Sequence, residues 1–94
     1  MSSSAPWAFE FSQSAAREFA RLDFAAQKRI TRYIEKRIAG GDPRRFGKPL
    51  SGDLHGLWRW RVDDYRLIGQ IQDGQLLILI VRVAHRSTVY GDYS

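Results

Sequence analysis

The chain lacks cysteine altogether, and this absence removes several kinds of chemistry. Without thiols there is no disulfide framework, no thiolate nucleophile and no cysteine ligand for zinc. The sequence also has no cluster of acidic residues suited to a divalent cation. We therefore expect no metal site and no cofactor. A cysteine-free composition fits a cytoplasmic location, which we take as the expectation.

Long hydrophobic runs are missing as well. The longest apolar stretch, residues 76–81, has the length of a strand, whereas a membrane-spanning helix needs roughly 20 residues. Residues 1–6 lack the basic and then apolar order of a signal peptide. We expect no membrane partner, a disordered leader over residues 1–6, and one domain over residues 7–94, because 94 residues support a single core.

Lysine is scarce in a chain that is otherwise strongly basic. Fifteen Lys and Arg residues against ten Asp and Glu give a net charge of +5, and only Lys28, Lys36 and Lys48 are lysines. The remaining basic residues are arginines, which bind phosphate or carboxylate through a planar fork of fixed donors. This balance predicts an anionic partner: a nucleic acid, an acidic protein or a membrane surface.

The first half of the chain predicts one strand and a helical hairpin. Residues 7–11 alternate apolar and polar side chains, as a half-buried strand does. Ser12 or Ser14 can cap a short helix over residues 15–22, and Asp23 can cap a second helix. That second helix ends before the glycine pair and proline of residues 40–43. Its buried stripe repeats every four residues: Ala26, Ile30, Ile34 and Ile38.

The second half predicts a basic loop and three strands. Residues 44–56 form the loop, and the strands cover residues 57–62, 65–72 and 75–83. Asp73-Gly74 favours a type I′ turn between the last two strands. The expected fold is α+β. An N-terminal strand and a helical hairpin precede a three-stranded antiparallel meander, and both helices pack on one face of a mainly antiparallel four-stranded sheet.

Arginines alternate with tryptophans in the first strand of the meander. Arg59 and Arg61 point to one face, whereas Trp58 and Trp60 point to the other, where we expect them to join the core. Arg66 begins the next strand, directly after a tight turn. If the three strands are adjacent, a single patch can converge from Arg59, Arg61, Arg66, Arg86 and Tyr90, with His85 nearby. The competing interpretation is that these arginines are edge-strand charges that discourage sheet-to-sheet pairing.

Four segments in the correct order resemble the RelE/ParE toxin superfamily. Residues 56–68 (GLWRWRVDDYRLI) are similar to its signature segment. The other three are residues 9–12 (FEFS), 48–50 (KPL) and 83–90 (VAHRSTVY). The resemblance covers nearly everything from Trp7 to Tyr90. It implies a RelE-like fold of two helices against a small antiparallel sheet, in agreement with the order of elements above.

The resemblance also implies a function. RelE-like toxins of type II toxin–antitoxin systems enter the ribosomal A site and cleave messenger RNA without a metal. A 2′-hydroxyl attacks the adjacent phosphate and leaves a 2′,3′-cyclic phosphate, which inhibits translation. The partners implied are mRNA, ribosomal RNA and a RelB-like antitoxin that binds the toxin in a hetero-oligomer. Two alternatives stay open: a ParE-like toxin that inhibits DNA gyrase by binding, and a non-catalytic nucleic-acid-binding relic.

By position, the family's catalytic residues correspond to Arg59, Arg61, Arg66, Arg86 and Tyr90. Tyr90 is the candidate base, since neighbouring guanidinium charges favour its ionised form. The acid is left open between His85, whose imidazole is a common proton donor in enzymes, and Arg86. This sequence has His85-Arg86 where a lysine–arginine pair is usual, and arginines where second-strand lysines often occur. From the basic loop, we assign RNA binding to Arg44, Arg45 and Lys48, and we interpret His55 as a loop residue.

Overall fold

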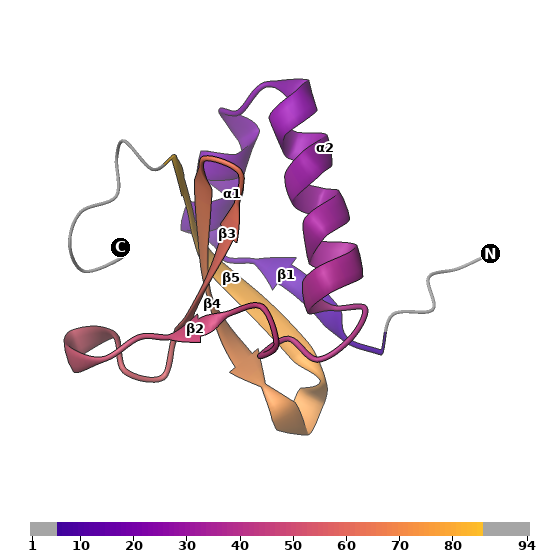
Figure 1. Ribbon diagram of the computed structural model, residues 1–94. Coiled ribbons are helices and arrows are strands. Elements are labelled where there is room, and N and C mark those ends of the chain that lie inside the picture. The colour runs from indigo at the N-terminus through magenta and orange to yellow at the C-terminus, as the bar shows by residue number, and fades with distance from the viewer. Residues whose placement is uncertain (1–5, 86–94) are drawn as a thin grey trace.

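The structure is a computed structural model that describes residues 6–85. Two helices and a sheet form two layers (Figure 1). The expected leader lies outside the described residues, apart from Pro6. The elements are β1 (Ala8–Phe11), α1 (Gln13–Ala20), α2 (Phe24–Tyr33), a π-helical turn (Ile34–Ile38), β2 (Lys48–Pro49), β3 (Trp58–Val62), β4 (Tyr65–Gln72) and β5 (Leu77–His85), with short 3₁₀ turns at Gly52–Leu54 and Asp73–Gln75.

The sheet has five strands in the order β1-β5-β4-β3-β2. β1 runs parallel to β5, and the other neighbours are antiparallel. The α+β fold and the adjacent meander are confirmed, but the expected count of four strands is wrong. The extra strand, β2, lies in the segment expected to be a loop. It has only two residues, one of them Pro49, so it carries no alternation that a sequence pattern can reveal.

Both helices begin at the caps that the sequence predicts. Ser12, rather than Ser14, caps α1, and its Oγ accepts a hydrogen bond from the Ala15 amide at 3.1 Å. Asp23 caps α2 by accepting from the Ala26 amide at 2.8 Å. These bonds satisfy amide groups that a first helical turn leaves without partners. None of the helices within residues 6–85 is both long and apolar enough to cross a membrane.

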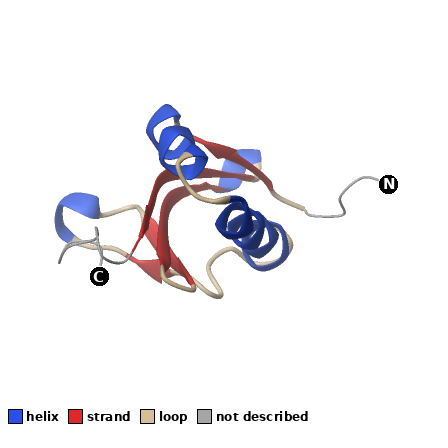
Figure 2. Ribbon diagram, turned by 90° about the horizontal axis from the view of Figure 1, so that it is seen from above, coloured by secondary structure: helices blue, strands red, loops and turns tan. Residues whose placement is uncertain are grey.

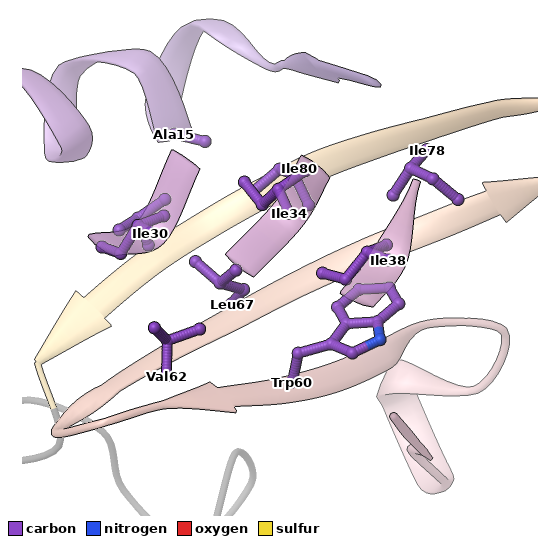
Figure 3. Close-up of a cluster of buried hydrophobic side chains, with 10 residues drawn as sticks. Ala15, Ile30, Ile34, Ile38, Trp60, Val62, Leu67, Ile78 and Ile80 are labelled. Carbon is purple, nitrogen blue, oxygen red and sulfur yellow. The ribbon is translucent and has the colours of Figure 1, made fainter. Parts of the chain in front are cut away.

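The core lies between the helices and one face of the sheet (Figures 2 and 3). α2 contributes Ile30, and the π-helical turn contributes Ile34 and Ile38, all fully buried. α1 lies along β5 and adds Ala15. A regular α-helix turns about 100° per residue. Side chains four residues apart therefore point about 40° away from each other, and a row of them rotates gradually away from the sheet. The π-helical turn is wider, and it returns Ile38 to the sheet.

Trp60 is the largest buried side chain, which confirms its expected place in the core. Its indole Nε1 donates a hydrogen bond to the Pro43 carbonyl oxygen at 2.9 Å. Gly47 and Gly69 lie against the ring, because a Cβ at either position would come within about 3 Å of it. Trp58 is half-buried at the margin of the same core. The indole of Trp60 therefore ties the loop before β2 to the middle of the sheet.

The loop between β4 and β5 is not the expected type I′ turn. Gln72 pairs with Leu77, so the loop contains four residues, and its first three form a 3₁₀ turn. The left-handed residue is Leu76, with φ of +50°, and Gly74 does not have a positive φ. The Asp-Gly signal thus located the hairpin correctly but predicted the wrong turn geometry.

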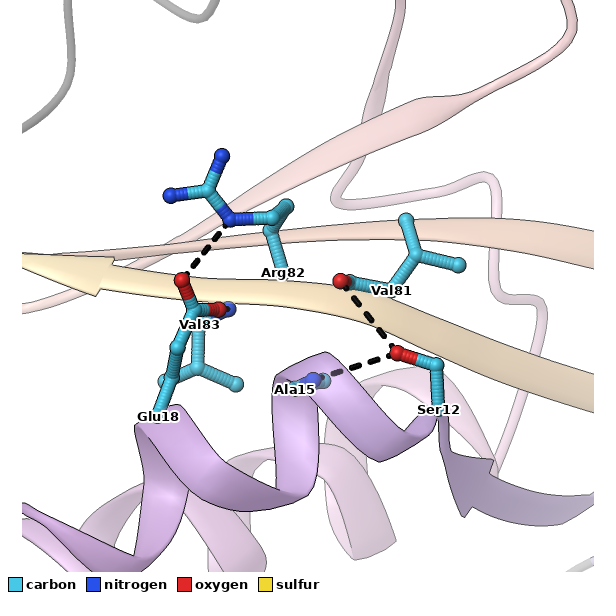
Figure 4. Close-up of polar contacts among 6 residues, drawn as sticks. All are labelled: Ser12, Ala15, Glu18, Val81, Arg82 and Val83. Atoms are coloured by element: carbon cyan, nitrogen blue, oxygen red, sulfur yellow. Dashed lines mark hydrogen bonds and ion pairs between the residues drawn. The ribbon is translucent and has the colours of Figure 1, made fainter.

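Helix α1 covers the edge of β5 beyond the point where β1 ends (Figure 4). β1 pairs with β5 only as far as Ile80. Further along, the Glu18 carboxylate accepts a hydrogen bond from the Val83 amide at 2.7 Å and another from Arg82 Nε at 2.8 Å. A side chain thus takes the hydrogen-bonding place that a neighbouring strand would occupy.

Candidate nucleic-acid interface

Basic side chains from four strands share the face of the sheet opposite the core. Residues paired directly across a sheet present their side chains on the same face. Lys48 pairs with Arg59, Arg59 with Ile68, and Ile68 with Arg82. In the next row, Arg61 pairs with Arg66. We call this surface the basic face, and its members are Lys48, Arg59, Arg61, Arg66 and Arg82.

The pair formed by Arg61 and Arg66 lies at the centre of the site. Residues in direct register have α-carbons about 4.5–5.5 Å apart, and like charges at such positions repel. The Arg61 side chain is exposed, and it makes no hydrogen bond or ion pair with residues 6–85. Two adjacent guanidinium groups, one of them open to solvent, favour an anion between them.

The charges on the sheet are unevenly distributed along the basic face. Glu10 of β1 shares this face through its pairing with Leu79, but β1 is the opposite edge strand from β2. Arg82 is bound by Glu18, whose carboxylate lies 2.8 Å from Arg82 Nε. Positive charge is therefore concentrated on β2, β3 and the start of β4.

His85 lies on the other face of the sheet. It pairs with Tyr65, and the two rings pack edge to face with centroids 5.3 Å apart. Tyr65 packs against the core, so the imidazole is on the core side, whereas Ala84 shares the face of Arg66. The structure therefore does not bring His85 together with the arginines. The other two C-terminal candidates, Arg86 and Tyr90, lie outside the described residues.

The three residues expected to bind RNA separate into two groups. Lys48 belongs to the basic face through its pairing with Arg59. Arg44 instead makes a two-bond ion pair with Asp73, with a shortest distance of 2.6 Å, and stacks over Trp58. This contact holds the pKa of the Asp73 carboxyl below its usual value.

Arg45 is also away from the basic face. Its guanidinium lies 5.5 Å from the ring centroid of Phe46, and Arg37 of the π-helical turn lies 5.2 Å from the same ring. His55 ends the 3₁₀ turn Gly52–Leu54 in the loop before β3, as expected of a loop residue.

A second basic surface lies on α2 and the π-helical turn that follows it. A hollow of about 280 Å³ separates the helix from the β3–β4 turn. Arg29 binds Asp63 across it at 2.8 Å. Burial raises the pKa of the Tyr33 hydroxyl, and the charge of Arg37 opposes that shift. The lining residues are Arg29, Arg32, Tyr33, Lys36, Arg37, Val62 and Asp63.

Comparison with known proteins agrees with this architecture. Residues 9–90 match the family described as "ParE toxin of type II toxin-antitoxin system, parDE". The chain is 33% identical over 90 residues to Toxin RelE of Mycobacterium tuberculosis, an alignment that covers 96% of this chain and 92% of the relative. It is 29% identical over 85 residues to Toxin RelG of the same organism, covering 90% and 97% of the two chains.

Solved structures show the same fold. The crystal structure of the toxin–antitoxin complex RelBE2 from Mycobacterium tuberculosis superposes with a TM-score of 0.81 at 28% identity, covering 89% of this chain and 95% of that one. The isolated RelE toxin of E. coli superposes with a TM-score of 0.69 at 16% identity, over 84% and 83% of the chains. At that identity the second match concerns the fold alone. The superfamily resemblance and the expected RelE-like fold are thus confirmed.

Proposed function

Because this chain belongs to the ParE toxin family of type II toxin–antitoxin systems, we propose that it is a ribosome-dependent endoribonuclease that cleaves messenger RNA in the ribosomal A site. The observation that carries this proposal is the facing pair of Arg61 and Arg66, flanked on the same surface by Arg59 and Lys48. Two arginines in direct register on one face offer two sets of fixed donors to the same phosphate.

The geometry suits an internal transesterification. The 2′-oxygen forms a bond to the adjacent phosphorus, the bond to the 5′-oxygen breaks, and the products are a 2′,3′-cyclic phosphate and a 5′-hydroxyl. Negative charge grows on the non-bridging oxygens during the attack, and Arg61 and Arg66 supply donors for it. Arg59 lies two residues from Arg61, about 6.6 Å along the strand, a spacing similar to that of successive phosphates. Arg59 and Lys48 thus suit the neighbouring phosphates.

Two proton transfers complete the proposed reaction. Tyr90 is the proposed base that takes the proton of the 2′-hydroxyl, and an acid must protonate the leaving 5′-oxygen. Of the two candidate acids, His85 lies on the core side of the sheet, which favours Arg86. With these two residues, the cleavage rate should change with pH as the Tyr90 phenol ionises. It should not show the change near about pH 6–7 that a catalytic histidine would cause.

The proposed partner is a RelB-like antitoxin. Several solved relatives are toxin–antitoxin complexes, among them RelBE2 of Mycobacterium tuberculosis and the intact RelBE complex of E. coli. An acidic antitoxin would be attracted to a chain with a net charge of +5. We expect the two proteins to be produced together, and the toxin alone to inhibit translation and growth.

A gyrase inhibitor is the second candidate, because the matching family model is named for ParE. The test compares Arg61→Ala and Arg66→Ala with a control, Arg17→Ala, which removes an exposed arginine from α1. Transcript ends are mapped in a translating extract, and supercoiling by purified gyrase is measured in parallel.

We expect each basic-face variant to lose on the order of 10²–10³ in cleavage rate, as when one donor to a developing oxyanion is removed. The Arg17→Ala control should cleave as the parent does. Intact transcripts together with inhibited gyrase would establish the ParE-like alternative, and no effect in either assay would favour a relic.

A further inference from the structure

A stripe of side chains runs along one side of α2 and the π-helical turn that follows it. With Phe19 of α1, it lines a hollow of about 330 Å³. Its members recur at intervals of three, one, three, one and three residues, the spacing of one face of a helix: Phe24, Gln27, Lys28, Thr31, Arg32 and Glu35. The stripe spans about 16 Å of helix axis at a rise of 1.5 Å per residue. A seam of this spacing and length matches the side chains of a second helix.

Phe24 provides an apolar anchor at one end of the stripe. It is 73% exposed, the largest exposure among the large hydrophobic side chains within residues 6–85. The Lys28 ammonium lies 5.4 Å from the ring centroid. Gln27 also lines the hollow, and its Nε2 donates hydrogen bonds to the carbonyl oxygens of Phe19 and Leu22, at 3.0 and 3.2 Å. The hollow therefore has a rigid floor, as a preformed docking site requires.

The charge around the stripe specifies an acidic occupant. Of the two glutamates on the helices, Glu18 is bound by Arg82, and only Glu35 lies on the stripe. The basic side chains of α1 and α2, together with the π-helical turn, are Arg17, Arg21, Lys28, Arg29, Arg32, Lys36 and Arg37. A partner that carries an apolar residue for Phe24 and carboxylates for Lys28 and Arg32 complements this surface.

Two features favour a protein partner over RNA on this surface. The Glu35 carboxylate on the stripe would repel a phosphate backbone, whereas it can pair with a basic residue in a helix. In addition, the basic face already offers facing arginines for RNA on the other side of the sheet. The two surfaces can therefore serve two different ligands.

We propose that the α2 stripe binds an acidic amphipathic helix of the antitoxin. This inference rests on the proposed toxin–antitoxin pairing and adds the site and the chemistry of contact. Because the docked helix lies across the core from the basic face, Phe24 contributes to antitoxin affinity and does not contribute to RNA cleavage.

The first test measures affinity for the proposed antitoxin, which we expect to be encoded beside this chain, by calorimetric titration of the purified proteins. Phe24→Ser and Arg32→Glu should each weaken binding at least tenfold, and the loss from Arg32→Glu should shrink at high salt. Leu76→Asn is the matched control, because Leu76 is 50% exposed on the β4–β5 loop, and it should bind unchanged. Unchanged affinity in Phe24→Ser would overturn the proposal.

The second test uses the absence of cysteine from the chain. Lys28→Cys places a single thiol on the stripe, and Gln75→Cys places one on the β4–β5 loop. Antitoxin binding should slow alkylation of the first thiol at least tenfold and leave the second as reactive as in the free toxin. Equal reactivity of the stripe thiol with and without antitoxin would refute the docking site.

Cleavage assays on the same variants separate the two proposals. Phe24→Ser should cleave transcripts at the parental rate. If it loses cleavage but keeps antitoxin affinity, the stripe is an RNA contact and the inference is wrong. If the unsubstituted chain shows no affinity for the neighbouring protein, then the proposed pairing itself fails, together with the site.

Discussion

Gly47→Ala tests whether the packing of Trp60 supports the basic face. A methyl group at residue 47 would lie 2.7 Å from the Trp60 Nε1 and 3.1 Å from its Cε2. The indole has no room to retreat, because a Cβ at Gly69 would come 3.1 Å from its other edge and the ring is fully buried. The added methyl must therefore displace the ring and strain its hydrogen bond to Pro43.

Three contributions set the size of the effect. Overpacking a core by one methyl group costs about 1–3 kcal/mol, and weakening a buried hydrogen bond costs about 1 kcal/mol or more. Replacing glycine also restricts the unfolded chain, which returns about 0.4–1 kcal/mol. We expect a net loss of about 2–3 kcal/mol in the free energy of unfolding. For a domain of this size the melting temperature then falls by on the order of 10–20 °C.

Urea unfolding followed by tryptophan fluorescence measures this loss directly. Gly41→Ala is the control, since no atom lies within 4 Å of a Cβ built there, and it should be neutral or slightly stabilising. Trp60 lies between Arg59 and Arg61 in β3, so Gly47→Ala should also reduce RNA cleavage in the folded protein. A Gly47→Ala variant as stable as the Gly41→Ala control would refute the packing argument.

Three further predictions concern the edge and the loops. Glu18→Ala should lose about 1–3 kcal/mol of unfolding free energy, because the Val83 amide loses its acceptor. Glu18→Gln keeps an acceptor oxygen and should lose less. Equal urea midpoints for the two variants would contradict this prediction. Leu76→Gly should gain about 1 kcal/mol in thermal unfolding, because a left-handed φ of +50° strains a leucine that is half exposed. The hydrogen bond and charge of Arg44 lower the pKa of the Asp73 carboxyl in the folded protein. Their ion pair therefore stabilises the fold at a pH above the pKa that Asp73 has in the unfolded chain. This stabilisation is lost as the pH falls through the lower pKa of Asp73 in the folded protein. Melting temperatures from pH 7 to about pH 3 should therefore decline less steeply for Asp73→Asn than for the parent.

Local signals predicted most of the fold. The alternation in residues 57–62 and 65–72 corresponds to β3 and β4, and the caps at Ser12 and Asp23 correspond to the helix starts. What local signals missed depends on tertiary contacts. β2 exists because Lys48 and Pro49 pair with β3, and their own sequence has no strand pattern. The strict four-residue repeat from Ala26 to Ile38 was a usable signal for the wider turn, since a regular helix would rotate its last members away from the sheet.

The candidate site was predicted in part. Strand parity placed Arg59 and Arg61 on one face, and the tight turn before β4 predicted Arg66 beside them, in agreement with the register. The structure adds Lys48 and Arg82 to this face through cross-strand register, which no single strand reveals. Alternation within β5 already separates His85 from Arg82 and Ala84, because the bulge between Ile80 and Arg82 lies before all three residues and leaves their register unbroken. The ion pair between Arg44 and Asp73 could not be predicted from the sequence, because the two residues are 29 positions apart.

The parallel pairing of β1 with β5 has a consequence for the order in which the chain folds. Ala8 pairs with Leu77, so the first strand has no sheet partner until nearly the whole described chain has been synthesised. The β3–β4–β5 meander joins neighbouring segments and can form early, whereas β1 must wait for a distant one. Phe9 therefore cannot reach its place beside β5 during translation until residues 77–80 have been made, whereas Phe11 can already stack on Phe19 of α1.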